Sequence, residues 1–342
     1  MSDQPESPQS SAAGVLAAAR RIAAGLLAPA AMQVEATQRV PASHLDALAA
    51  AGLYGIAGPP GYGGLDLDLG TACAVVEALA GACLSTAFVW LQHHGAVRAV
   101  AAGGDRLRED WLRPLCLGER RSGVALGGTL PGPARLRATP VAGGYLVDGI
   151  SPWVTGWGYI DTLHVAARDP DDNVVWSLLD AEPGPALAAE PLGMVAVMAS
   201  RTVQATFREL YVPQERVTGV LPLREWLQRD ANGLRMNGSL ALGVAARCCE
   251  LAGPSGLDAE LAAARAALDG ASAPEMPAAR ARACELAARA AAALLVRQGS
   301  TSILLGQDAQ RLAREAMFLL VFGSRPAIKH DLAGLLSAGR PR

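Results

Sequence analysis

The sequence predicts an α+β fold in three consecutive parts: an N-terminal helical domain, a middle antiparallel β domain and a C-terminal helical bundle. Apolar residues make up 51% of the chain and aromatic residues only 4%, and most of the apolar share is alanine, leucine and valine, a composition that favours helices. The composition changes near residue 122 and reverts near residue 220. Between these points, short runs with β-branched and aromatic residues are separated by Gly, Pro and Asp, as in a sheet.

These changes set the expected boundaries. Residues 1–12 are rich in Ser, Pro and Gln and are expected to form a disordered tail. Residues 13–121 form the N-terminal helical domain, 122–220 the middle β domain and 221–342 the C-terminal helical domain. A total of 342 residues suits two or three such domains.

The N-terminal region has helical spacing throughout. Residues 58–64 are rich in Gly and Pro and form a loop, and the next helix covers residues 69–82. A further helix from Ser85 carries Trp90 and the adjacent pair His93 and His94. Neighbouring residues on a helix point in different directions, so the two imidazoles cannot readily share one metal ion. We interpret Trp90 and His94 as residues that either pack between helices or line a substrate pocket.

The middle region shows strand patterns. Residues 162–167 and 173–179 read as strands joined by the turn Asp169-Pro170-Asp171-Asp172. Residues 202–212 alternate apolar and polar side chains, which predicts a half-buried strand.

The stretch 144–157 reads as a strand, a Gly turn and a second strand with Trp153 and Thr155 two residues apart. Residues two apart on a strand face the same way, so an indole and a hydroxyl would share one surface. A planar ring with polar edges, such as a flavin, would suit that pair. The alternative from these residues alone is a half-buried strand with a core tryptophan.

Helical periodicity returns after residue 222. Long helices are expected at 234–251, 278–298 and 300–322, with an Ala-rich helix and a loop between the first two. Helices, then a sheet, then helices again is a more specific signal than any single motif in the chain.

Charge and cysteine content exclude several functions. A net charge of -2 and a pI near 6.2 give no electrostatic basis for nucleic-acid binding. We also expect no membrane partner, since no run approaches the roughly 18 apolar residues that span a bilayer. The six cysteines include no CxxC pair and no His at metal-ligand spacing, which predicts no metal site and a reducing, cytoplasmic location.

The order of the three parts, together with four segments, resembles the acyl-CoA dehydrogenase family over roughly residues 30–330. The segments are Leu53-Tyr54-Gly55-Ile56 with Gly61-Tyr62-Gly63-Gly64, residues 144–156, residues 207–217, and Arg311 to Glu315, which is similar to the family's Arg-x-x-Arg-Asp.

The resemblance implies an FAD-dependent oxidoreductase acting on the CH–CH group of an acyl thioester, carried by CoA or by an acyl-carrier protein. In this family a carboxylate removes the α-proton while a hydride passes to the flavin, and a homodimer or homotetramer completes the FAD site. By the same resemblance Trp153, Val154 and Thr155 would flank the flavin. Leu126, Gly127 and Gly128 would occupy the family's second flavin loop.

Departures from the family pattern bear on the reaction. Phe322 stands where the catalytic Glu usually falls, and Asn237 stands at the alternative base position early in the first C-terminal helix. The loop at 126–132 lacks the family's Thr and Ser-Asp, and no counterpart of its Arg-x-x-Phe-Gly segment is present, which implies a weakened or lost FAD site. The resemblance gives as substrate-pocket residues Trp90, His94, Arg235, Asn237 and Phe322.

Three hypotheses follow. The first is a dehydrogenase with a relocated base, for which Glu225, Asp230 and Glu250 are candidates, although each reads more readily as a surface charge. The second is a diverged member with changed chemistry, either a flavin monooxygenase or a non-redox biosynthetic enzyme. The third is a subunit without a base, paired with an active homologous partner. The sequence does not name the substrate.

Overall fold

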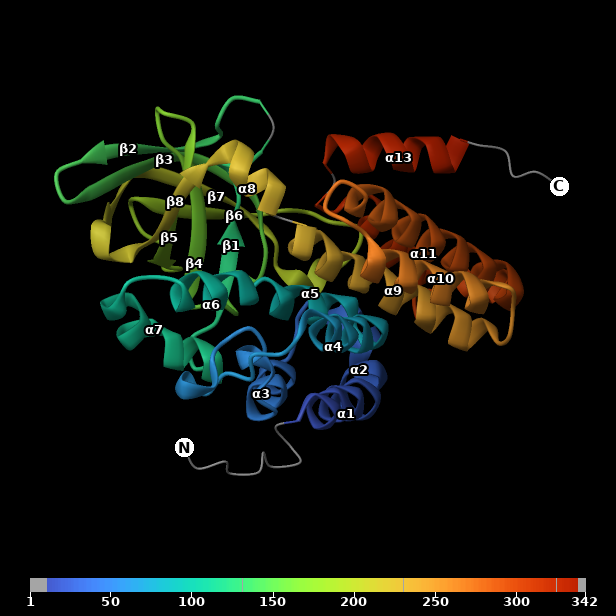
Figure 1. The fold of residues 1–342 in the computed structure, drawn as a ribbon. Coiled ribbons are helices and arrows are strands. Elements are labelled where there is room, and N and C mark those ends of the chain that lie inside the picture. Colours follow the sequence, from blue (N-terminus) through green and yellow to red (C-terminus); the bar gives the residue numbers. More distant parts are fainter. Residues whose placement is uncertain (1–10, 131, 230, 324, 338–342) are drawn as a thin grey trace.

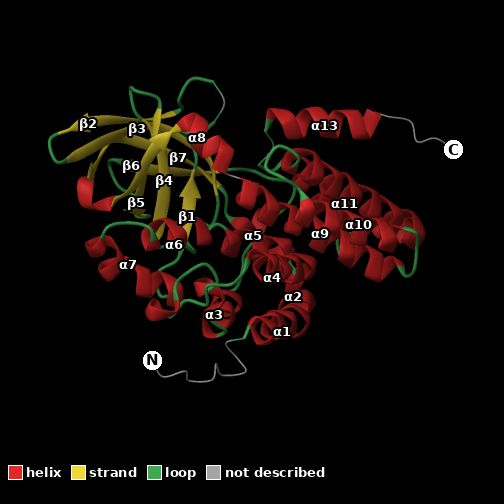
Figure 2. Ribbon diagram, viewed as in Figure 1, coloured by secondary structure: helices red, strands yellow, loops and turns green. Residues whose placement is uncertain are grey.

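The computed structural model describes residues 11–337 except 131, 230 and 324. The N-terminal helices lie beneath an eight-stranded sheet on one side and a bundle of C-terminal helices on the other (Figure 1). Strands and helices are segregated in space (Figure 2), so the predicted α+β architecture in three consecutive parts is confirmed. Most of the expected N-terminal tail, residues 1–10, lies outside the described residues.

The N-terminal part is helical, as predicted. The helix expected from Ser85 is two helices that break at Gln92 and His93, so His94 begins a new helix rather than continuing the one that carries Trp90. The elements are α1 (Ala12–Ile22), η1 (Ala23–Leu27), α2 (Ala28–Thr37), α3 (Ala42–Ala50), η2 (Leu53–Gly55), η3 (Pro60–Tyr62), α4 (Leu69–Ala82), α5 (Leu84–Leu91), α6 (His94–Ala101) and α7 (Asp105–Leu117).

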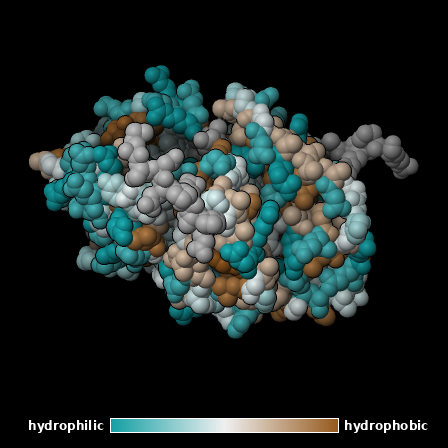
Figure 3. Space-filling view, turned by 60° about the horizontal axis from the view of Figure 1, so that its bottom comes forward, coloured by the Kyte–Doolittle hydropathy of each residue, from teal (hydrophilic) through white to brown (hydrophobic). Residues whose placement is uncertain are grey.

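The first helical stretch needs a correction to the sequence-based expectation. Residues Ala12–Thr37 form one run, with a π turn in its middle, that is long and apolar enough by composition to cross a membrane. One such helix is weak evidence for a membrane segment, because helices of a protein core pass the same test. Its buried residues Ala19, Leu27 and Ala31 belong to the main core. On the underside of the molecule, hydrophobic and hydrophilic side chains are interspersed (Figure 3).

The sheet has the strand order β6-β7-β3-β2-β4-β5-β8, with β1 beside β4. Most neighbours are antiparallel, but β1 and β4 run parallel and so do β2 and β4, so the sheet is mixed rather than wholly antiparallel. Long connections leave room for such parallel pairs. The strands are β1 (Ser122–Ala125), β2 (Leu136–Val141), β3 (Gly144–Val154), β4 (Thr162–Arg168), β5 (Asn173–Asp180), β6 (Leu187–Pro191), β7 (Val203–Pro213) and β8 (Val217–Pro222).

The Gly turn expected within residues 144–157 is absent from β3, which is one continuous strand. Gly149 instead lies at a register shift against β7, with φ of 120°. A Cβ at Gly149 would lie 2.2 Å from the carbonyl oxygen of Arg135, so only glycine allows this close approach.

The C-terminal helices form a bundle that packs on α4. The helix expected at 300–322 is a short 3-10 turn followed by α12, and a final helix, α13, was not anticipated. At the crossing of α4 and α9, Gly81 meets Gly243, and a Cβ on Gly81 would lie 2.8 Å from the Gly243 oxygen. The elements are α8 (Leu223–Arg229), α9 (Ala231–Ala252), α10 (Leu257–Gly270), α11 (Met276–Gln298), η6 (Gly299–Ile303), α12 (Asp308–Val321) and α13 (Pro326–Ser337).

Candidate functional site

Trp153 and Thr155 do not share a surface, contrary to the sequence-based expectation. The indole of Trp153 is 64% exposed, whereas Thr155 and the intervening Val154 are buried. Between Ser151 and Val154, β3 holds one residue more than its partner β7, so a bulge at this point breaks the alternation. Trp153 itself has φ of 62°, a region that a large side chain rarely enters.

The end of β3 is held by a short hydroxyl cluster. The Thr155 and Thr202 hydroxyl oxygens are 3.2 Å apart, and the Ser200 hydroxyl is 2.7 Å from that of Thr202. Two further residues of the same region, Val197 and Arg201, also have positive φ. Strained residues of this kind gather at ligand sites, so the exposed and strained Trp153 marks the edge of β3 as a candidate site.

Leu126, Gly127 and Gly128 form the loop after β1. The Gly127 N–H donates to the Ser151 hydroxyl and the Gly128 N–H to the Ala166 carbonyl, so neither amide is free for a cofactor. A Cβ on either glycine would strike the backbone of β3 or β4. These glycines therefore serve close packing of the loop on the sheet.

Arg168 fixes the same loop, and sequence analysis missed this residue. Its guanidinium donates to the carbonyl oxygens of Gly128 at 2.9 Å, Leu130 at 2.9 Å and Gly132 at 3.1 Å. A loop restrained by one side chain at three carbonyls keeps a defined shape without a ligand.

Trp90 and His94 are packed inside the N-terminal domain. The Trp90 indole nitrogen donates to the Leu53 carbonyl at 3.2 Å, and its ring meets the His94 imidazole edge-on at 4.4 Å. Neither ring nitrogen of His94 has a hydrogen-bond partner, and burial lowers the pKa of this imidazole well below its usual value. His94 is therefore neutral.

Arg235 is an internal ion-pair residue. It is 4% exposed and donates from Nε to Asp269 at 2.9 Å and from Nη1 to the Ser239 hydroxyl at 2.7 Å. Because Asp269 of α10 compensates its charge, Arg235 mainly joins α9 to α10.

Asn237 and the Phe322–Gly323 turn, the two places where the resemblance puts a base, lie together. A Cβ placed on Gly323 would lie 3.7 Å from the amide nitrogen of Asn237 and 3.4 Å from Nη1 of Arg280. Arg280 donates to the carbonyl oxygens of Phe322 at 2.7 Å and Gly323 at 3.1 Å. Arg280 was not anticipated, because one arginine in an Ala-rich helix carries no sign of what it faces.

The charge of Arg280 is uncompensated within the described chain. Its side chain is fully buried, its Nε has no hydrogen-bond partner, and no described Asp or Glu pairs with it. Burial lowers the pKa of this guanidinium. The base positions therefore hold an amide and a buried cation in place of a carboxylate.

Aromatic rings line the same region. The Phe322 ring stacks on Phe318 of α12 at 5.4 Å, and Phe88 of α5 meets Phe322 edge-on at 4.8 Å. The Phe322 ring also lies 5.5 Å from Cζ of Arg280. An apolar wall and a cation thus meet where the N-terminal and C-terminal helices adjoin.

The candidates for a relocated base are engaged elsewhere. Glu225 pairs with Arg229 on α8, and Glu250 pairs with Arg247 on α9, as solvent-exposed helix pairs. Asp230 lies outside the described residues. Within the described chain, no group of three or more His, Cys, Asp or Glu side chains is placed to hold a metal ion.

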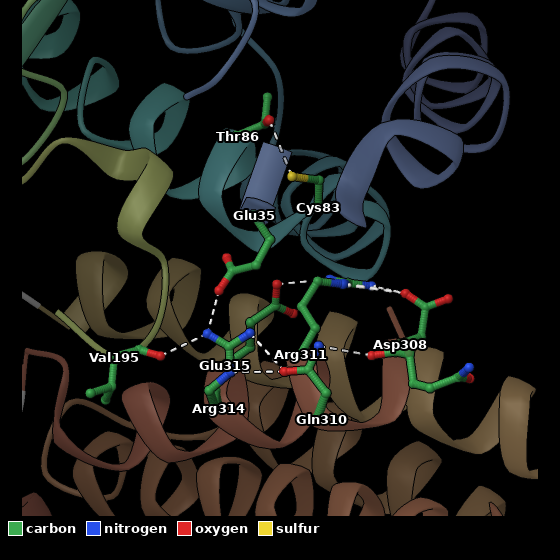
Figure 4. Close-up of polar contacts among 10 residues, drawn as sticks. Glu35, Cys83, Thr86, Val195, Asp308, Gln310, Arg311, Arg314 and Glu315 are labelled. Carbon is green, nitrogen blue, oxygen red and sulfur yellow. Dashed lines mark hydrogen bonds and ion pairs between the residues drawn. The ribbon is translucent and has the colours of Figure 1, made fainter. Parts of the chain in front are cut away.

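The Arg311–Glu315 segment forms an ion network (Figure 4). The Arg311 guanidinium donates to Glu315 and Asp308, at 2.7 Å each, and is almost fully buried. Arg314 pairs with Glu35 of α2 and donates at 2.8 Å to the Val195 carbonyl, in the connection between β6 and β7. Arg314 therefore joins all three parts of the fold.

The residues present fit the ring of a flavin better than its phosphates. An exposed indole held in a strained conformation beside buried hydroxyls offers a planar surface for a planar ligand. In the loop after β1, the amides of Gly127 and Gly128 are both engaged within the protein and are not available to a diphosphate.

Sequence comparison relates the N-terminal part of the chain to one family of enzymes. Residues 12–119 match the model of the acyl-CoA dehydrogenase N-terminal domain. The chain is 28% identical over 163 residues to the 3-sulfinopropanoyl-CoA desulfinase of Variovorax paradoxus, covering 46% of this chain and 41% of the relative. It is 25% identical over 175 residues to the mitochondrial isovaleryl-CoA dehydrogenase of Arabidopsis thaliana, covering 48% and 43%. These matches span less than half of either relative.

The whole chain has the fold. Butyryl-CoA dehydrogenase from Megasphaera elsdenii superposes with a TM-score of 0.82 at 18% identity, covering 98% of this chain and 100% of that one. The N-terminal domain therefore matches the acyl-CoA dehydrogenase family in sequence, and the chain as a whole has the acyl-CoA dehydrogenase fold.

Proposed function

We propose that this protein is an acyl-CoA dehydrogenase-like oxidoreductase that binds FAD and an acyl thioester, in a site that lacks the family's carboxylate base. The proposal rests on the arrangement of three residues. Trp153 is exposed on the sheet, and Asn237 lies next to the Phe322–Gly323 turn between the helices. A bound flavin would supply a hydride acceptor. The remaining chemistry belongs to the chain's own side chains.

Trp153 would cover one face of the flavin ring. Phe88, Phe318 and Phe322 would exclude water from the acyl chain, which strengthens every polar contact in the site. Asn237 can donate or accept a hydrogen bond but is too weakly basic to remove an α-proton. Simple saturated acyl thioesters would therefore bind and be oxidised slowly.

The test begins with the purified protein. It should be yellow, retain FAD, and show little anaerobic bleaching on addition of butyryl-CoA. Asn237→Glu should restore bleaching by a factor of about 100 or more, because a positioned general base contributes on that order. Asn237→Gln is the matched control and should restore nothing. A colourless protein that takes up no added FAD would overturn the proposal.

A second candidate function is non-redox removal of an acidic group from an acyl thioester. It is favoured by the uncompensated Arg280, which would stabilise an anion, and it needs no carboxylate base. The name of the relative from Variovorax paradoxus, 3-sulfinopropanoyl-CoA desulfinase, describes chemistry of this kind for that protein. Conversion of 3-sulfinopropanoyl-CoA and water to propanoyl-CoA and sulfite, with no change in flavin absorbance, would favour this candidate over dehydrogenation.

We further propose a cytoplasmic homodimer or homotetramer acting on CoA or acyl-carrier-protein thioesters. All six cysteines are buried free thiols, as suits a reducing compartment. Co-purification with a second homologous chain would instead indicate a subunit without a base that works beside an active partner. Light scattering of the purified protein separates these assemblies.

A further inference from the structure

Arg280 and Asn237 border a small space left by a missing side chain. Gly323 is solvent-exposed and has φ of 54°, and a Cβ on it would lie 3.4 and 3.8 Å from the two terminal guanidinium nitrogens of Arg280. The same Cβ would lie 3.7 Å from the Asn237 amide nitrogen. Three nitrogen atoms therefore surround the space that a larger residue at position 323 would fill.

This space is bordered by hydrogen-bond donors rather than by a carboxylate. The resemblance would put the family's base at position 322 or 237, next to this space, whereas this chain has Phe322 and Asn237 there and presents donors from α9 and α11. A buried cation with no charged partner is costly, and an anion that pairs with it recovers much of the cost. The two carbonyl oxygens that Arg280 now contacts are neutral and satisfy only part of its five donors.

Three other arginines of the bundle do not share this property. Arg235, Arg289 and Arg311 each pair with at least one described carboxylate. Arg280 instead donates to main-chain carbonyls and leaves Nε unpartnered. This difference marks Arg280 as a specificity residue rather than one more member of the ion-pair network.

We propose that Arg280, Asn237 and Gly323 form a subsite for an acidic group on the acyl chain, so that the substrate is an acyl thioester bearing its own carboxylate or sulfinate. The substrate's anion would lie beside Phe322 and Asn237, the positions where the resemblance would put a carboxylate base. This assignment rests on the proposed function, because it takes the acyl thioester as the ligand. Phe322 would pack beside the carbon chain between the thioester and the acid.

Binding, rather than turnover, tests the subsite. Isothermal titration would compare malonyl-CoA with propionyl-CoA and succinyl-CoA with butyryl-CoA, pairs that match in carbon number and share the same CoA phosphates. The wild type should bind each acidic member at least tenfold more tightly. Charge-assisted bidentate contacts of a guanidinium have this strength.

Two variants remove the subsite in different ways. Arg280→Gln removes the charge. Gly323→Ala fills the space and keeps both Arg280 and Asn237, at the cost of some backbone strain because φ at this position is 54°. Both should reduce the preference for the acidic thioester to about twofold or less, with neutral thioesters bound as before. Arg289→Gln, the same change on the same helix at an already paired arginine, should keep the preference. If Arg280→Gln does not fold, Gly323→Ala alone can test the subsite.

The outcomes separate this inference from the proposed function. The subsite would be overturned if the wild type bound acidic and neutral thioesters equally, or if Gly323→Ala kept the preference for acidic thioesters. Either result would still support the binding of acyl thioesters. Failure of all four thioesters to bind would overturn both.

Discussion

Arg314 of α12 forms an ion pair with Glu35 of α2, and these residues lie 279 positions apart in the sequence. The Glu35 side chain is only 8% exposed, and Arg314 also donates to the Val195 carbonyl between β6 and β7. One guanidinium thus fixes the N-terminal helices, the sheet and the C-terminal bundle relative to one another.

Glu35→Gln should lower the free energy of unfolding by about 2 to 4 kcal/mol. The substitution keeps the shape of the side chain but leaves Arg314 without its charged partner in a largely enclosed place. Urea denaturation measures the change. Glu225→Gln breaks an exposed pair on α8 and should cost less than about 1 kcal/mol. Equal effects of the two variants would show that Arg314 does not join the domains.

The crossing of α4 and α9 depends on two glycines. A Cβ on Gly243 would lie 2.4 Å from the carbonyl oxygen of Glu77 and 2.8 Å from the amide nitrogen of Gly81. Gly243→Ala should therefore destabilise the protein by about 1 to 3 kcal/mol, despite the higher helix propensity of alanine. Gly95→Ala has open space around its Cβ and should be neutral or stabilising. Thermal unfolding of both variants measures these effects. A lower melting temperature for Gly243→Ala alone would show that close helix packing outweighs the gain in helix propensity.

Local patterns in the sequence predicted local structure well. The turn at 169–172 joins β4 and β5, and the residues of β7 alternate between buried and half-buried from Val203 to Phe207, as expected. These features depend on turn residues and on side-chain period, which a single sequence contains. The three-part order followed from the same signals.

Features that depend on distant partners could not be read from the sequence. The exposure of Trp153 follows from a bulge against β7, which no pattern within β3 reveals. Arg280 is one of four arginines in α11, and its partners lie more than forty residues further along the chain. The convergence of Asn237 with Gly323 likewise depends on tertiary packing.

Replacing Trp153 should weaken flavin binding without lowering the stability of the protein. Because its indole is 64% exposed and its φ is positive, Trp153→Gly should relieve backbone strain and leave the protein as stable or slightly more so. The same variant should retain markedly less FAD after gel filtration. Tyr211→Ala removes another exposed ring from the sheet and should retain wild-type FAD. Unchanged flavin content in Trp153→Gly would place the flavin ring elsewhere.

Two buried imidazoles make the fold sensitive to acid. Burial lowers the pKa of His93 and of His164 to about 3, and each ring keeps hydrogen bonds in its neutral form. In the unfolded chain, each histidine takes up a proton below about pH 6.5. The unfolded state therefore binds more protons between pH 6.5 and 3, and stability falls as the pH falls through this window.

His164→Phe should reduce that pH dependence. The new ring can keep the stacking that His164 makes with Trp176, while the titrating group and its contact with Thr218 are lost. Each buried histidine contributes about 1.4 kcal/mol per pH unit below 6.5, so wild type should lose about 2 kcal/mol more than the variant between pH 7 and pH 5. Urea midpoints at both pH values measure this difference. His330→Phe, at a solvent-exposed position, is the control and should follow the wild-type slope. If the stability of His164→Phe depended on pH as steeply as that of the wild type, the His164 imidazole would not be held neutral in the folded protein.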